Sequence, residues 1–162
     1  MGIQPVSHPN AARVADHARA GGVELEVIEY PAGTRTAGDA ARAVGCAVDQ
    51  IVKSMVFAAG SGLVLALTSG IHMVDPEALA IAAGVERCSR ADADGVRAAT
   101  GYPIGGVPPF GHSQSLPTLI DPHLQTFEIV WAAAGTPRHV FPIRPADLVR
   151  LSGARPAHFT TG

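Results

Sequence analysis

Small apolar residues recur at helical spacing near the start of the chain. Ala11, Val14, Ala15 and Ala18 stand at positions i, i+3, i+4 and i+7, with polar residues between them. This spacing predicts a helix over residues 10–20, with Asn10 as its N-cap and Gly21-Gly22 as its end.

Later stretches alternate or run apolar without a break, which is typical of strands. Residues 23–30 alternate valine and leucine with glutamate and predict a half-buried strand. Residues 51–59 and 63–69 predict a strand pair, because the short linker Gly60-Ser61-Gly62 is a hairpin signal. Shorter strands are predicted over residues 85–88, 118–120, 127–132 and 139–141.

Capping residues mark the remaining helices. Thr36, followed three residues later by Asp39, predicts a capping-box start, and Asp75-Pro76 is a typical N-cap and first helical residue. The predicted helices cover residues 36–44, 75–83, 89–100 and 144–151, and the tail after them is expected to fray. The mixture predicts an α+β fold: one domain over residues 1–162, with its core at about 10–153 and a central mixed, mostly antiparallel sheet flanked by helices.

Composition excludes several classes of protein. Of 162 residues, 47% are hydrophobic and 16% are charged, which argues against disorder. No apolar stretch approaches the ~20 residues of a membrane span, and the first residues lack the pattern of a signal peptide. The 2 cysteines are far apart in sequence and predict free thiols. We therefore expect a cytoplasmic protein that makes no membrane contact.

The net charge and the absence of several motifs argue against some kinds of binding and catalysis. The net charge of −2 provides no general attraction to nucleic acid, so any RNA contact must be local. The 7 histidines form no HxH or HExxH pattern, and we expect neither a metal nor a cofactor. The sequence has no GxSxG motif, which argues against an α/β-hydrolase nucleophile.

Lys53 is the only lysine of the protein, and it lies inside the apolar run IVKSMVF at 51–57. Alternation in a strand places Lys53 on the face of Met55 and Phe57, and places Ser54 on the opposite face. A lysine there either extends its ammonium to solvent at a strand end or lines a pocket. In a pocket, its charge would bind a phosphate, a carboxylate or a carbonyl oxygen.

A second candidate element is the glycine- and proline-rich segment 101–111, with the sequence GYPIGGVPPFG. Gly105-Gly106 would let the backbone approach a ligand closely, and Pro108-Pro109 would stiffen the exit. The alternative is a tight structural turn. His112 follows this segment and could reach a site or lie on the surface.

Four segments in this order resemble the YbaK/EbsC family of aminoacyl-tRNA deacylases, relatives of the editing domain of bacterial prolyl-tRNA synthetase. They are IVKSMVF at 51–57, VD at 74–75, TGY with GGVPPFG at 100–111, and LPTLID at 116–121. The resemblance covers about residues 10–153. It implies hydrolysis of the ester between a wrong, small amino acid and the 3′-terminal adenosine of tRNA, in trans to the synthetase.

The same resemblance implies residue roles. Lys53 corresponds to the family's active-site lysine, and the glycine-rich loop to its substrate loop. The predicted substrate-binding residues are Thr36, Ser54, Gly101, Gly105, Gly106, Val107, Pro109, Gly111 and His112. Ser54 occupies a position that varies among subgroups, so the amino acid removed stays open.

The resemblance also indicates the partners of the protein. The acceptor end of mischarged tRNA is the expected substrate, delivered alone or by a synthetase or an elongation factor, and Arg138, Arg144 and Arg150 are candidate phosphate contacts. Two alternatives remain: a non-catalytic module that binds aminoacyl-adenosine or a tRNA end, and a general small-ester hydrolase.

Overall fold

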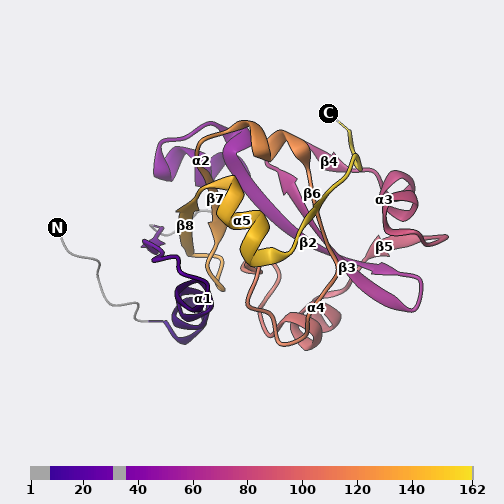
Figure 1. Ribbon diagram of the computed structural model, residues 1–162, viewed down its shortest axis with the longest axis horizontal. Coiled ribbons are helices and arrows are strands. Elements are labelled where there is room, and N and C mark those ends of the chain that lie inside the picture. The colour runs from indigo at the N-terminus through magenta and orange to yellow at the C-terminus, as the bar shows by residue number, and fades with distance from the viewer. Residues whose placement is uncertain (1–7, 31–35, 162) are drawn as a thin grey trace.

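Five α-helices occur in the computed structural model, which describes residues 8–30 and 36–161 (Figure 1). They are α1 (Pro9–Ala20), α2 (Ala37–Val44), α3 (Pro76–Ala83), α4 (Ala93–Thr100) and α5 (Pro145–Ser152), with 3-10 helices η1 (Val48–Gln50) and η2 (Pro122–Thr126). The helices predicted from capping residues are therefore present. None of the described helices is both long and apolar enough to cross a membrane.

Helix starts follow local hydrogen bonds. The capping box of α2 is confirmed: Thr36 Oγ1 accepts from Asp39 N–H, and the Asp39 carboxylate accepts from Thr36 N–H. The predicted N-cap of α1 is wrong, because His8 Nδ1 accepts from the N–H of Asn10, which is already helical. Likewise α4 starts at Ala93 rather than at residue 89, because the Asp92 carboxylate accepts from Gly95 N–H.

The strands form one large mixed sheet and one small sheet. The main sheet has the order β1-β8-β7-β2-β3-β6-β9, with β5 also paired to β2, and β10 pairs with β4 separately. The strands are β1 (Ile28–Glu29), β2 (Ile51–Ala59), β3 (Gly62–Ser69), β4 (Met73–Val74), β5 (Cys88–Arg90), β6 (Thr118–Ile120), β7 (Val130–Ala133), β8 (His139–Ile143), β9 (Arg155–Pro156) and β10 (Thr160–Thr161). The α+β fold in a single domain is confirmed.

The predicted strand pair is present as the antiparallel hairpin of β2 and β3, which lies at the centre of the sheet. Its register pairs Val52 with Ser69 and continues to the turn, while β2–β7, β3–β6 and β6–β9 are parallel. In Figure 1 this hairpin crosses the molecule from the side of β8 and α1 to the side of α3.

Some predicted strands are shorter or shifted. The predicted strand 23–30 reduces to β1, since only Ile28 and Glu29 pair with β8. The strand predicted at 85–88 moves to β5, and the one predicted at 127–132 moves to β7. The prediction of a frayed tail is wrong: β9 and β10 both pair, and Phe159 is fully buried.

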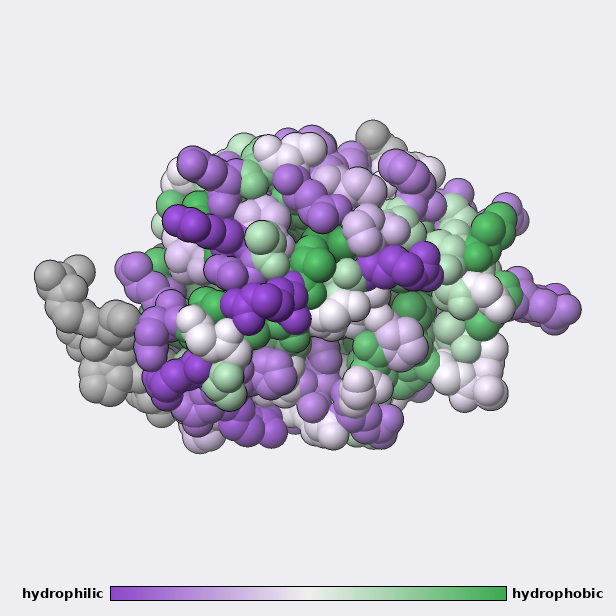
Figure 2. All heavy atoms as spheres, in the orientation of Figure 1, coloured by the Kyte–Doolittle hydropathy of each residue, from purple (hydrophilic) through white to green (hydrophobic). Residues whose placement is uncertain are grey.

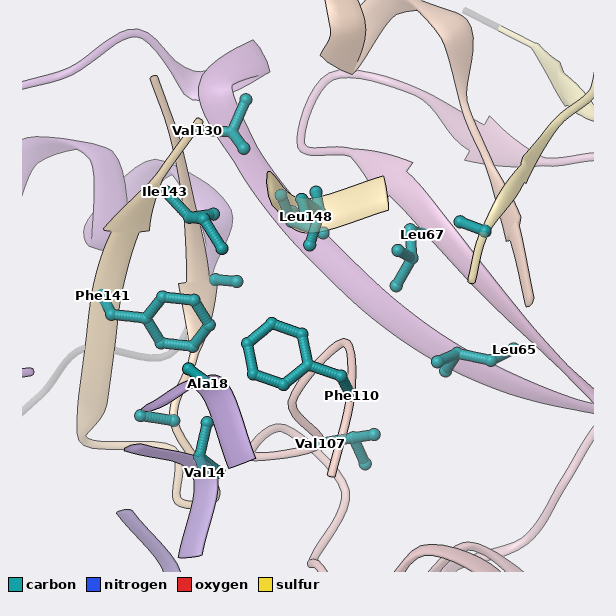
Figure 3. Packing of buried hydrophobic residues seen from close by; sticks show 14 of the residues in the cluster. Val14, Ala18, Leu65, Leu67, Val107, Phe110, Val130, Phe141, Ile143 and Leu148 are labelled. Carbon is teal, nitrogen blue, oxygen red and sulfur yellow. The ribbon is translucent and has the colours of Figure 1, made fainter. Parts of the chain in front are cut away.

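The helices cover both faces of the main sheet. On one face, residues of α1, α4 and α5 pack with Val56, Leu65 and Leu67 of the hairpin. Figure 3 shows this core, where the Phe110 and Phe141 rings lie 5.7 Å apart. On the other face, α2 and α3 pack in two smaller clusters.

The outer surface mixes polar and apolar residues. Figure 2 shows them interspersed over most of the face viewed in Figure 1, with strongly apolar residues near α3. That helix carries Ile81, which is 82% exposed.

Candidate functional site

A cavity of about 750 Å³ opens beside the middle of β2. Its wall combines segments that are far apart in sequence: residues 51–57 of β2, the start of α2, β4, the end of β5, the loop 104–107 and the segment 136–140. A volume of this size is typical of small-molecule sites.

Lys53 lines this cavity, half-buried, rather than extending from a strand end. Its Nζ donates a hydrogen bond of 2.6 Å to the backbone carbonyl oxygen of His72, in the turn between β3 and β4. Burial lowers the pKa of Lys53, and the nearby Arg90 cation lowers it further, while the Asp121 carboxylate acts in the opposite direction. The ammonium is thus held at a fixed position in a partly dehydrated wall.

A buried carboxylate anchors the turn that carries this carbonyl. Asp121 follows β6 and its side chain is only 3% exposed; its Oδ2 lies 2.6 Å from His72 Nδ1. The same carboxylate accepts from the N–H groups of Ser69 at 3.1 Å and His123 at 3.0 Å. His72 therefore has both its ring and its carbonyl engaged, and the position of Lys53 depends on Asp121.

The charged side chains in the wall are cations. Lys53 and Arg90 line the cavity together with His139, and no described lining residue is acidic. Burial lowers the pKa of His139, against the effect of Glu29, so its imidazole is neutral at pH 7. Burial also raises the pKa of Tyr30, another wall residue, to about 12, so this phenol is neutral as well. Such a wall favours anions and oxygens that gain negative charge.

Two further predicted residues line the same cavity. Ser54 lines the cavity from β2, and its buried Oγ has no hydrogen-bond partner among the described residues. Thr36 also lines the cavity, although its hydroxyl already caps α2.

Only some residues of the glycine-rich loop line the cavity. Gly105, with φ +86°, and the buried Val107 line the cavity. Gly106 is not part of the wall but packs on the backbone of Thr136, where a Cβ would lie 2.6 Å from the Thr136 Cα. Gly106 therefore supports the wall by allowing two backbone segments to touch.

The other predicted loop residues lie outside the cavity. Gly101 ends α4 with φ +82°, and Pro109 is buried away from the wall. Gly111 and His112 line a second cavity of about 180 Å³. His112 is partly buried: its Nε2 lies 2.7 Å from the C=O of Pro108, and burial lowers its pKa. The structure does not bring these four residues to Lys53, and their role in binding stays a prediction.

The three predicted arginines are spread over the surface. Arg138 lies between two wall residues and is 3.5 Å from Glu29. Arg144 precedes α5, and Arg150 donates to Gly21 C=O at 2.7 Å. Neither of the latter two lines the cavity, and phosphate contacts by all three stay predictions.

Sequence reasoning missed several wall residues. Arg90 falls inside the predicted helix 89–100, and His139 and Thr136 carry no motif. The one sequence feature that could have indicated His139 was the predicted strand at 139–141, which follows the candidate residue Arg138. Thr136 Oγ1 and His139 Nδ1 lie 2.6 Å apart, so these two residues form a second polar group in the wall.

The part of the protein that is described holds no group of three or more metal-ligating side chains. The polar side chains that line the cavity include the cations Lys53 and Arg90 and the hydrogen-bonding groups of Ser54 and His139.

The chain is similar to known proteins in sequence and in fold. The family model for the aminoacyl-tRNA editing domain matches residues 31–151. A solved structure described as a candidate trans-editing enzyme for prolyl tRNA synthetase is 42% identical, with a TM-score of 0.91, covering 97% of this chain and 100% of that chain. The structure of hypothetical protein APE2540 is 25% identical, with a TM-score of 0.84 and coverage of 92% and 99%.

A curated relative is also similar over most of its length. The uncharacterized protein YwhH of Bacillus subtilis (strain 168) is 27% identical over 130 residues, which are 80% of this chain and 82% of that protein.

Proposed function

Because this chain belongs to the aminoacyl-tRNA editing domain family, we propose that it hydrolyses the ester between a mischarged small amino acid and the 3′-terminal adenosine of tRNA. The observation that carries the proposal is Lys53, which lines the cavity and whose ammonium donates a hydrogen bond of 2.6 Å to the backbone carbonyl oxygen of His72. The charged groups among the described wall residues are all basic, which suits a reaction that develops negative charge on oxygen.

The reaction needs few groups from the protein. The oxygen of water bonds to the ester carbonyl carbon, and the carbonyl electron pair moves onto oxygen. When this oxyanion collapses, the bond to the ribose oxygen breaks, and that oxygen receives the proton that water lost. The products are the free amino acid and the intact tRNA end.

Named residues can serve each step. Lys53 stabilises the oxyanion. His139, neutral because burial lowers its pKa, accepts the proton from water at Nε2 when its Nδ1–H donates to Thr136 Oγ1. No side-chain nucleophile is required.

The acceptor end of tRNA is proposed to enter from the side of Arg90 and Arg138. Arg90 lines the cavity, and Arg138 is adjacent to wall residues 137 and 139. We propose tRNAPro as the first tRNA to test, because the similar solved structure is described as acting for prolyl tRNA synthetase. A synthetase or an elongation factor remains the proposed source of the substrate.

The test is deacylation of alanyl-, seryl-, threonyl- and cysteinyl-tRNAPro by the wild type, Lys53→Ala and Arg19→Ala. Removal of an oxyanion-stabilising group is expected to lower kcat/KM by about 10²–10³. Arg19 is the matched control, since it lies on the surface in ion pairs with Asp16 and Glu24. Full turnover by Lys53→Ala would refute the assigned role.

The same assay separates the alternatives. Binding of aminoacyl-tRNA without release above the spontaneous rate would indicate a non-catalytic module. Equal kcat/KM for alanyl-adenosine and alanyl-tRNAPro would indicate a general small-ester hydrolase.

A further inference from the structure

Strand β2 has a gap along one of its edges. On one edge, β3 pairs with it from Val52 to Ala59. On the other edge, β7 pairs only with Ile51 and Val52, and β5 pairs only from Phe57 onward. Between them no described strand pairs with β2.

The alternation of peptide groups shows which atoms face this gap. Gly70 N–H donates to Ile51 C=O across the hairpin, so odd-numbered residues of β2 direct their peptide groups to β3. Ala91 N–H donates to Val56 C=O, so even-numbered residues face the other edge. The gap therefore presents the N–H and C=O of Ser54 and the N–H of Val56.

The gap and the cavity coincide. Every residue from Ile51 to Phe57 lines the cavity, and so do Ala133, Arg90 and Ala91 at the ends of the flanking strands. An open strand edge is a template that hydrogen-bonds a further strand. Here the space beside it is occupied by no described residue and is bounded by Lys53.

An aminoacyl ester carries the same pair of groups as one residue of a strand: a nitrogen donor and a carbonyl oxygen, joined through one Cα. In an antiparallel hydrogen-bonded pair, two opposite residues exchange both N–H to C=O bonds. Ser54, with both groups directed to the gap, is complementary to one such residue.

We propose that the aminoacyl group of the substrate binds as a one-residue strand opposite Ser54, its α-ammonium donating to Ser54 C=O and its ester carbonyl accepting from Ser54 N–H. This inference rests on the proposed deacylase function and adds the group that the enzyme recognises. The ester carbonyl is then polarised by the backbone N–H of the residue that follows Lys53.

The same pairing places the substrate side chain. Opposite residues of an antiparallel pair point to the same face of the sheet, so the side chain would lie beside Ser54 Oγ and Val56. The cavity wall on this face is apolar and includes Val96 and Val107, which belong to the large buried core. A packed apolar wall limits the size of the amino acid that fits.

The first experiment changes the substrate. Nitrous acid converts alanyl-tRNAPro into lactyl-tRNAPro, which keeps the carbonyl and replaces the ammonium by a hydroxyl. Each rate is divided by the spontaneous hydrolysis rate of that ester. The inference predicts that this acceleration falls about 10- to 100-fold for the lactyl ester, the worth of a charged hydrogen bond.

The outcomes distinguish the two proposals. If none of the alanyl-, seryl-, threonyl- and cysteinyl-tRNAPro esters is hydrolysed above its spontaneous rate, the proposed function fails. If one of them is hydrolysed and its α-hydroxy analogue is accelerated equally, the function stands and the strand-like binding of the ammonium is refuted.

The second experiment observes the strand edge by amide hydrogen exchange. In the free protein the Ser54 N–H should exchange much faster than that of Met55, which pairs with Ala66 in the β3 ladder. A stable amide analogue, 3′-alanylamino-3′-deoxyadenosine, at a concentration that inhibits deacylation by nine-tenths, should slow Ser54 at least tenfold and leave Met55 unchanged. Equal protection of the two amides in the free protein, an unchanged Ser54 rate, or failure of this analogue to inhibit would overturn the inference.

Discussion

Asp121→Asn tests whether a residue outside the cavity wall controls Lys53. The substitution keeps the size of the side chain and removes its charge. Asp121 does not line the cavity. Its carboxylate accepts a hydrogen bond from the ring of His72, and the backbone C=O of His72 accepts one from the Lys53 ammonium. The change therefore acts on Lys53 through the turn and through the electric field.

The cost in stability follows from the contacts. The carboxylate, 3% exposed, accepts from His72 Nδ1, Ser69 N–H and His123 N–H. Hydrogen bonds to a charged group contribute about 1.5–3 kcal/mol each, and the amide oxygen of asparagine preserves part of this set. We expect the free energy of unfolding to fall by about 3 kcal/mol, measured by urea denaturation.

The effect on pH dependence has a definite sign. The Asp121 carboxylate raises the pKa of Lys53, so its removal lowers that pKa further. The active form is the ammonium, whose contribution is lost as pH rises through this pKa. The alkaline limb of kcat should therefore move to lower pH in Asp121→Asn, measured after subtraction of spontaneous hydrolysis.

Asp147→Asn is the matched control. Asp147 is 34% exposed and pairs with Arg150 at 3.2 Å on the surface of α5. Its substitution should cost less than about 1 kcal/mol and leave the alkaline limb in place. An Asp121→Asn protein with the wild-type alkaline limb would refute the coupling of Asp121 to Lys53.

Three further outcomes are expected. Arg90→Ala should raise KM for aminoacyl-tRNA and, because the Arg90 cation lowers the pKa of Lys53, should move the alkaline limb of kcat to higher pH, opposite to Asp121→Asn. Gly106→Ala should destabilise the protein, because its Cβ would lie 2.6 Å from a backbone atom of Thr136. Gly38→Ala in α2, where the nearest neighbour of the new Cβ is 3.7 Å away, should raise the free energy of unfolding by about 0.5–1 kcal/mol. Urea denaturation measures both changes. Phe159→Ala should cost about 3–5 kcal/mol, because the ring is fully buried; an unchanged urea midpoint would show that the tail is not part of the core.

Local patterns predicted the elements that local interactions determine. The capping box at Thr36 and the strand pair around Gly60-Ser61-Gly62 were correct because their causes lie within a few residues. The strand at 23–30 was overestimated, since its length depends on how far β8 continues beside it. The tail was misjudged for the same reason: Phe159 is ordered by distant partners that leave no local signal.

The candidate site was predicted in part. Lys53 was identified because a lone charge in an apolar strand is conspicuous, and the structure places it in the cavity. Arg90 and His139 were missed because only the pairing of β5 and β8 into one sheet brings them to the wall. Gly106 was identified for its flexibility, but its function in the fold is a close backbone contact that requires a partner at Thr136.

The single lysine has a consequence for the integrity of the protein itself. An aminoacyl ester readily acylates a free amine, and such a reaction on Lys53 would join the amino acid to the enzyme through a permanent amide. The neutral amine is the form that attacks, and burial together with the Arg90 cation lowers the pKa of Lys53 and so increases the fraction of that form. The burial that places Lys53 in the cavity wall therefore also exposes the enzyme to acylation by its own substrate. Because Lys53 is the only side-chain amine in the sequence, each such event would appear in the intact mass as one added aminoacyl group.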